Sequence, residues 1–230
     1  MKLLSLSTAE QGCSLAITDD KALVCEEFWN AKLTHSKRLV KMIEHLLEKR
    51  AGIKLDDMDG FVAAKGPGSF TGLRIGISVI KGLAYAMEKP AAGVSSLDGI
   101  AFRFVHSSVP VCVMMDARRN EVYCAVYQFD QGRLVSKSQE RVVSPQEAIG
   151  MTKGSVLFAG SGSKAYKPII EQTACRPLIA HDFLDSVSAT ALILSLCSKE
   201  NFLNQPDNIL TPSYIRKSDA QLQFAEKQGY

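Results

Sequence analysis

The sequence of 230 residues has no uninterrupted apolar run close to the roughly 20 residues that a membrane-spanning helix needs. It also has little excess charge, because 27 lysines and arginines face 24 aspartates and glutamates and leave a formal net charge of +3. We therefore expect no membrane contact and no dedicated nucleic-acid coat. The first eight residues hold one lysine and a short apolar stretch broken by serines, which favours a strand over a signal peptide. We therefore expect a cytoplasmic location.

Several motifs of catalytic and metal sites are also missing. The histidines include no pair spaced i, i+4, so a helix-borne zinc site is not expected. There is no G-x-S-x-G nucleophile elbow, and the six cysteines form no C-x-x-C pair. We expect the cysteines to be reduced core residues, and we predict no catalytic residue and no metal ligand.

The composition is that of a globular chain. An apolar fraction of 46% and a charged fraction of 22% allow a sizeable core. At 230 residues the chain can form one large or two compact domains.

The first half has the pattern of a strand meander followed by alternating helices and strands. Apolar alternation between polar turns predicts antiparallel strands at residues 2–8, 13–18 and 22–29. A helix is expected from Thr34 or Ser36 to about Arg50. Further along we expect a buried strand at residues 60–65, a helix from Phe70 to Glu88 and a strand at residues 91–95.

The second half repeats this pattern, with strands expected at residues 110–116, 121–129 and 133–143. Aligning Ser7 with Asp116 also aligns Ala16 with Ala125, and a second Gly-Ser loop follows, although about one helix is expected to be lost before it. Two mixed domains could show such matches by coincidence. We interpret them as a duplication, with an α/β fold in two similar domains at residues 1–106 and 107–230.

The most informative segment is the run G-P-G-S-F-T-G-L-R-I-G that begins at Gly66. A glycine-rich turn before a helix can bind phosphate through its backbone N–H groups. The run lacks both the lysine of a phosphate loop and the G-x-G-x-x-G fingerprint, so a tight turn with close backbone contacts is the alternative. The weak cofactor-binding candidates are Gly66, Gly68, Ser69, Asp116, Gly160 and Gly162.

Both helices of the first half have apolar faces wider than one sheet can cover. The arcs span roughly 160° and 200°, whereas a helix on a sheet needs about 100°. Either the helices are buried between domains or they form a docking surface for another protein. We favour docking and predict these interface residues: Leu39, Met42, Ile43, Leu46, Leu73, Ile75, Gly76, Val79, Leu83 and Met87.

Three runs together resemble one protein family. The glycine-rich run, D-A-R-R-N-E-V-Y from Asp116 and P-S-Y-I-R from Pro212 are similar to those of the bacterial TsaB family, also called YeaZ. The similarity extends from Met1 to about Arg216. It implies two tandem actin-like (ribonuclease H-like) domains, each a mixed sheet with an antiparallel three-strand meander and flanking helices. It also implies a part in making threonylcarbamoyladenosine beside the anticodon of tRNA.

In that family the catalysis belongs to a larger paralogue, TsaD, which holds a metal through histidines, and the ATPase TsaE binds the pair. The resemblance therefore implies a non-catalytic scaffold or activator of TsaD. It implies no cofactor of its own, since ATP and metal act on the partner subunits. It further implies TsaD docking through the two wide helices, a homodimer when TsaD is absent, and tRNA contact only through the complex.

One departure from the family pattern concerns Ser7-Thr8-Ala9, where the family usually has D-T-A. The change removes the carboxylate expected near a nucleotide-bound metal. The alternative function is a nucleotide-binding ATPase or phosphotransferase that uses the Gly66 and Gly160 loops and Asp116. Basic residues around the first helix, such as Lys37 and Lys41, are either solvated or contact tRNA within the complex.

Overall fold

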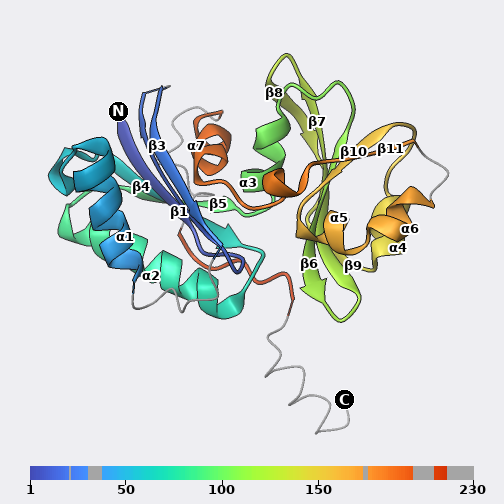
Figure 1. Ribbon diagram of the computed structural model, residues 1–230, viewed down its shortest axis with the longest axis horizontal. Helices are drawn as coiled ribbons and strands as arrows, with labels where there is room; N and C mark the ends of the chain where they lie inside the picture. The colour runs from blue at the N-terminus through green and yellow to red at the C-terminus, as the bar shows by residue number, and fades with distance from the viewer. Residues whose placement is uncertain (21, 31–37, 173–175, 199–209, 217–230) are drawn as a thin grey trace, which may run out of the picture.

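The computed structural model describes residues 1–20, 22–30, 38–172, 176–198 and 210–216, which form two sheets with helices around them (Figure 1). The first sheet has the strand order β3-β2-β1-β4-β5. β1, β2 and β3 are antiparallel neighbours, and β4 and β5 continue parallel to β1. This confirms the first meander, with bounds β1 Lys2–Ser7, β2 Cys13–Asp19, β3 Ala22–Trp29, β4 Gly60–Gly66 and β5 Ala91–Ser95.

The second sheet has the order β11-β10-β6-β7-β8, with β9 also paired to β7. Its bounds are β6 Val111–Arg118, β7 Glu121–Asp130, β8 Arg133–Lys137, β9 Arg141–Val143, β10 Val156–Ala159 and β11 Pro177–Ile179. The single strand expected at residues 133–143 is wrong, because β8 and β9 are separate. Between them the hydroxyl of Ser138 accepts the Val126 N–H at 2.9 Å, which replaces a backbone acceptor and interrupts the ladder.

The two sheets repeat one topology. β6, β7, β8, β10 and β11 have the same neighbours and directions as β1, β2, β3, β4 and β5. The helix expected to be lost in the second copy is present but short. It is α4, Pro145–Gly150, and Ser144 caps it by accepting the Glu147 N–H at 3.2 Å. The chain therefore has the predicted α/β fold of two tandem domains, each a mixed sheet with an antiparallel three-strand meander and flanking helices.

The first two helices lie against one face of the first sheet (Figure 1). α1, Leu39–His45, continues as a π-helical turn over Leu46–Ala51, and the caps expected at Thr34 or Ser36 lie outside the described residues. α2, Phe70–Ala86, begins after Ser69, whose hydroxyl accepts the Gly72 N–H. It ends two residues before the expected Glu88, which adopts a left-handed conformation with φ of 53°.

The remaining helical segments are α3 Asp98–Ala101, α5 Ser161–Ala165, α6 Lys167–Glu171, α7 Ala189–Cys197, and single 3-10 turns at Leu55–Asp57, Phe102–Phe104 and Asp182–Leu184. α7 comes from the second half yet packs on the first sheet, against β1, β2 and β4 (Figure 1). Its buried Leu192 and Leu196 belong to the same core as Leu4 and Phe61. The domain boundary at residue 107 stays a prediction, and the structure adds that both halves share one core.

No helix within the described ranges is both long enough and apolar enough to cross a bilayer.

Candidate functional site

A cleft of about 790 Å³ lies between the two domains. Its walls come from the β1–β2 turn, the loop between β4 and α2, the end of β6, and residues 213–216. Of the predicted cofactor-binding candidates, Gly68, Ser69 and Asp116 line the cleft. Gly66, Gly160 and Gly162 are buried and do not line it.

The glycine loops are used for close backbone packing. A Cβ on Gly68 would overlap the carbonyl oxygen of Ala9, and one on Gly160 would overlap that of Met114. Both glycines have positive φ, +153° and +102°, which other residues rarely adopt. The Ser69 N–H also donates to the Ala9 carbonyl at 2.7 Å. These contacts support the tight-turn interpretation of both loops.

The donors of the second loop are engaged by carboxylates. The Gly160 N–H donates to Oδ1 of Asp185 at 3.0 Å, and the Ser161 hydroxyl donates to Oε1 of Glu10 at 2.8 Å. The other Glu10 oxygen accepts the Val187 N–H at 3.2 Å. Burial raises the pKa of Glu10 and raises that of Asp185 to about 6. A phosphate bound here would displace one carboxylate and lie beside the other, so this loop does not fit a nucleotide.

Sequence reasoning missed Glu10 and Asp185. Glu10 stands in a polar turn that has the composition of a solvated loop. Its bonding partners Ser161 and Val187 lie 151 and 177 positions further along the chain. No local pattern could have indicated these contacts.

The strand ends of the two copies differ as the sequence indicates. Ser7 ends β1 and is buried, whereas Asp116 is exposed two residues before the end of β6. Oδ1 of Asp116 accepts the Arg118 N–H at 2.9 Å. Within the described residues, no three side chains of the metal-ligating types come together. Of the two strand ends, therefore, only that of β6 carries a carboxylate.

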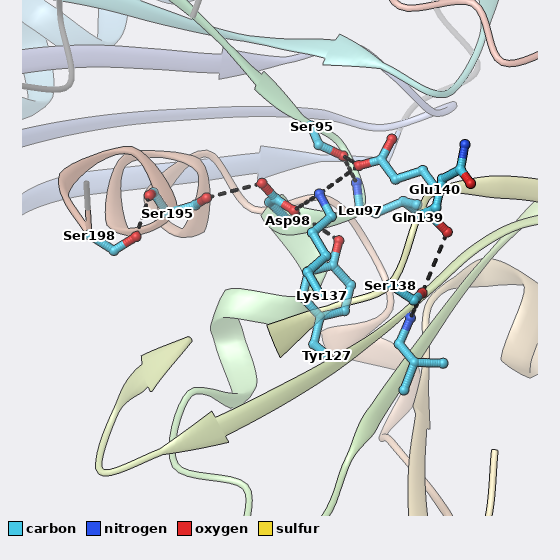
Figure 2. Close-up of polar contacts among 11 residues, drawn as sticks. Ser95, Leu97, Asp98, Tyr127, Lys137, Ser138, Gln139, Glu140, Ser195 and Ser198 are labelled. Carbon is cyan, nitrogen blue, oxygen red and sulfur yellow. Dashed lines mark hydrogen bonds and ion pairs between the residues drawn. The ribbon is translucent and has the colours of Figure 1, made fainter. Parts of the chain in front are cut away.

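Figure 2 shows a polar network that links α3 to the second sheet and to α7. Asp98 accepts the Tyr127 hydroxyl at 2.8 Å and the Lys137 ammonium at 2.6 Å. Its other oxygen accepts the Ser195 hydroxyl at 3.2 Å, and Lys137 also contacts Glu140 at 2.7 Å. Burial by itself lowers the pKa of Lys137, but the two carboxylates outweigh burial and the pKa is raised. The network therefore holds a cation where the domains meet.

The structure divides the predicted interface residues into two groups. Those whose side chains or Cα atoms are buried are Leu39, Ile43, Leu46, Leu73 and Gly76. Those partly exposed are Met42, Ile75, Val79, Leu83 and Met87. Gly76 is covered because a Cβ there would overlap the Thr8 hydroxyl. The surface a partner could reach is thus narrower than the helical arcs indicate.

The predicted interface left out exposed apolar side chains on α1 and α2. Tyr85 on α2 is 88% exposed and Val40 on α1 is 59% exposed. We call the line Ile75, Val79, Leu83 and Met87 together with Tyr85 the α2 strip. A tyrosine at the edge of an apolar arc gives a weak sequence signal, because its ring suits a core as well as a surface.

Comparisons with known proteins agree over nearly the whole chain. The family model described as TsaD, tRNA N6-adenosine threonylcarbamoyltransferase, matches residues 29–224. A Bacillus subtilis protein named tRNA threonylcarbamoyladenosine biosynthesis protein TsaB is 28% identical over 99% of this chain and 100% of its own. The Escherichia coli protein of the same name is 34% identical over 72% of this chain and 74% of its own. The chain belongs to the TsaB family.

The structural comparison extends this finding to the fold. The solved structure of YeaZ from Pseudomonas aeruginosa matches 93% of this chain and 99% of its own, with 29% identity and a TM-score of 0.76. The resemblance to TsaB (YeaZ) drawn from the three sequence runs is confirmed. The resemblance implied that TsaB and TsaD are paralogues, and the match of this chain to the TsaD family model agrees with that.

Proposed function

We propose that this chain is a non-catalytic subunit that docks on a TsaD homologue and stabilises or activates it in tRNA threonylcarbamoyladenosine biosynthesis. Similarity to relatives named for that biosynthesis, over nearly the full length of the chain, carries the proposal. The match to the TsaD family model supports a place beside that enzyme. Since tRNA is modified in the cytoplasm, we place the protein there.

The α2 strip is the proposed docking surface. Ile75, Val79, Leu83 and Met87 follow one another every four residues, so they form one ridge along the helix. Small side chains at Ser78 and Gly82 lie beside this ridge, and no atom lies within 4 Å of a Cβ placed on Gly82. A helix of the partner could therefore pack closely. Self-association would bury the same strip, so a homodimer competes with TsaD binding.

The chain contributes no cofactor to this scheme. The carboxylates of Glu10 and Asp185 at the second loop support the view that ATP and metal act on the partner subunits. A TsaE homologue is the third component, and tRNA is reached only through the assembled complex. Calorimetry with ATP and magnesium is expected to detect no binding. Micromolar binding that Asp116→Ala abolishes would favour the ATPase alternative.

The docking surface is tested by introducing charge on the α2 strip. Tyr85→Glu and Val79→Glu are expected to weaken binding to a TsaD homologue at least about tenfold, since a buried unpaired carboxylate opposes association. Tyr85 is 88% exposed, so its substitution leaves the fold intact.

The matched control is Val135→Glu, at a site 62% exposed on β8 of the other domain. It is expected to bind like the wild type. Dissociation constants from interferometry and a circular dichroism spectrum of each variant make the comparison. Equal binding by all three variants contradicts docking through the α2 strip.

A further inference from the structure

We infer that residues 210–216, which we call the strap, are a releasable latch that joins the two domains at the mouth of the cleft. We further infer that the latch regulates docking through α2, and this part rests on the proposed function. The strap is the red segment that passes between the two halves in Figure 1. Three sets of contacts carry the inference, two on the first domain and one on the second.

The first set fastens the strap to the glycine loop. The Ser213 N–H donates to the Lys65 carbonyl at 2.7 Å, and a Cβ on Gly66 would lie 2.5 Å from the Ser213 carbonyl oxygen. Leu210 is 5% exposed and belongs to the main core. The strap thus lies directly on the loop that leads into α2.

The second set reaches the start of α2. The Tyr214 ring stacks on the Phe70 ring with 4.6 Å between centroids, and the Tyr214 hydroxyl accepts the Arg74 Nε–H at 3.0 Å. The Arg74 guanidinium also lies 3.8 Å from the Phe70 centroid. Arg74 immediately precedes Ile75, the first residue of the α2 strip. The strap therefore orders the side chain at one end of the docking surface.

The third set fastens the strap to the second domain. The Arg216 guanidinium donates to the Ala117 carbonyl at 2.6 Å and pairs with Glu121 at 3.1 Å. The Arg216 side chain is only 12% exposed, whereas that of Glu121 is 39% exposed, so only the arginine end of the ion pair is shielded from water. These contacts hold the β6–β7 turn, where three successive residues other than glycine have φ of 60°, 52° and 58°. Such backbone persists only where its surroundings fix it.

The contacts given above for the strap suit a latch because they are mostly polar. Within seven residues the strap bonds to both sides of the cleft, and Leu210 is its only member of the main core. Breaking the polar contacts costs far less than unfolding a domain, so the strap can be released while the sheets stay intact. Release would free the β6–β7 turn and the first turn of α2 together.

The link to docking follows from Arg74. A partner on the α2 strip meets Arg74 in its ordered position when the strap is closed, and in many rotamers when it is open. Ordering a free arginine opposes binding, so the closed form is the one that the partner binds better. By thermodynamic linkage, docking must then stabilise the closed strap to the same degree.

The latch is tested in the full-length free chain by hydrogen exchange with mass spectrometry. Arg216→Ala is expected to speed exchange of the β6–β7 turn and of residues 65–74 about tenfold or more, because charge-assisted hydrogen bonds are lost. Exchange in α7 should not change, which shows that the core stays folded. Arg133→Ala, at an exposed site on β8, is the matched control.

Tyr214→Phe provides a milder variant, since it keeps the ring stack and removes only the hydroxyl bonded to Arg74. It is expected to speed exchange at the start of α2 and to leave the β6–β7 turn unchanged. If both variants exchange at these sites as slowly as the wild type, the latch is overturned.

The regulation of docking is tested by affinity. Arg216→Ala and Tyr214→Phe are expected to weaken binding to a TsaD homologue several-fold, and the partner should slow exchange of the strap in the wild type. If the variants bind like the wild type, the coupling is overturned while the docking role stands. If the wild type does not bind at all, the proposed function fails, and the exchange experiment on the free chain still decides the latch.

Discussion

At the scale of single residues, the Asp185 carboxylate lies in an unfavourable environment beside the Gly160 loop. It is 5% exposed, and its Oδ2 has no hydrogen-bond partner in the part of the chain that the structure describes. Burial raises its pKa from a usual value of 3.8 to about 6. The neighbouring Glu10 carboxylate acts in the same direction. The ionised form is therefore tolerated at a cost in stability.

This cost leads to a prediction about how the stability of the protein depends on pH. Because the folded-state pKa is raised, the contribution of Asp185 is fully present below about pH 4 and is lost as the pH rises through about 6. Asp185→Asn cannot ionise and keeps an acceptor for the Gly160 N–H. Relative to wild type, the free energy of unfolding of this variant should be about 1–2 kcal/mol higher at pH 8 than at pH 4.5, which means a gain in relative stability.

Urea denaturation at the two pH values measures this difference. The control is Asp130→Asn, which changes an exposed carboxylate at the end of β7. An identical difference between Asp185→Asn and wild type at both pH values contradicts the assignment.

Gly68 gives a second prediction at this scale. Its φ of +153° and the adjacent Ala9 carbonyl leave no room for a Cβ. Gly68→Ala is expected to lower the free energy of unfolding by about 2–3 kcal/mol. Gly82→Ala is the matched control, since that helical glycine is open to solvent, and it should raise stability by about 0.5–1 kcal/mol. Thermal denaturation followed by circular dichroism compares the two, and an unaffected Gly68→Ala would rule out the packing role of the loop.

At the scale of elements, α2 illustrates what local pattern can and cannot give. Its length and the Ser69 cap follow from periodicity and from the residue types at its start. The wide apolar arc is also real, but its parts have different roles. Gly76 and Leu73 are buried under the first sheet and Thr8, while Val79 and Met87 stay partly exposed. A helical wheel shows the arc, whereas the neighbours decide which part of it a partner can reach.

The second meander shows a limit of the same kind. Residues 133–143 have the alternation of one long strand, yet they form β8 and β9. The break depends on Ser138, whose hydroxyl bonds to Val126 on β7. A serine in a strand pattern carries no local sign of this role, because the partner strand supplies the donor.

At the scale of the whole molecule, the network around Lys137 fixes how the halves meet (Figure 2). It joins α3, the second sheet and α7, which lie far apart in the sequence. The carboxylates of Asp98 and Glu140 share this one ammonium group. Removing the ammonium leaves two partly buried carboxylates close together without a cation.

Lys137→Met is therefore expected to destabilise the protein by about 2–4 kcal/mol, although methionine restores much of the apolar volume. Chemical denaturation measures the loss. Lys153→Met, at an exposed lysine outside the helices and strands, is the control and should change stability by less than about 0.5 kcal/mol. A loss no larger than in this control would show that the network adds nothing to the joint between domains.

The sequence by itself determined the duplicated meanders, the helix after the glycine run and the TsaB family, because strand and helix periodicity and contiguous motifs are local properties. Only the tertiary structure decided that α7 packs on the first sheet. It also decided that Glu10 bonds to Ser161 and that Arg216 bonds to the β6–β7 turn. The physical reason is distance along the chain: these partners lie about a hundred or more positions apart, and folding alone brings their donors and acceptors together.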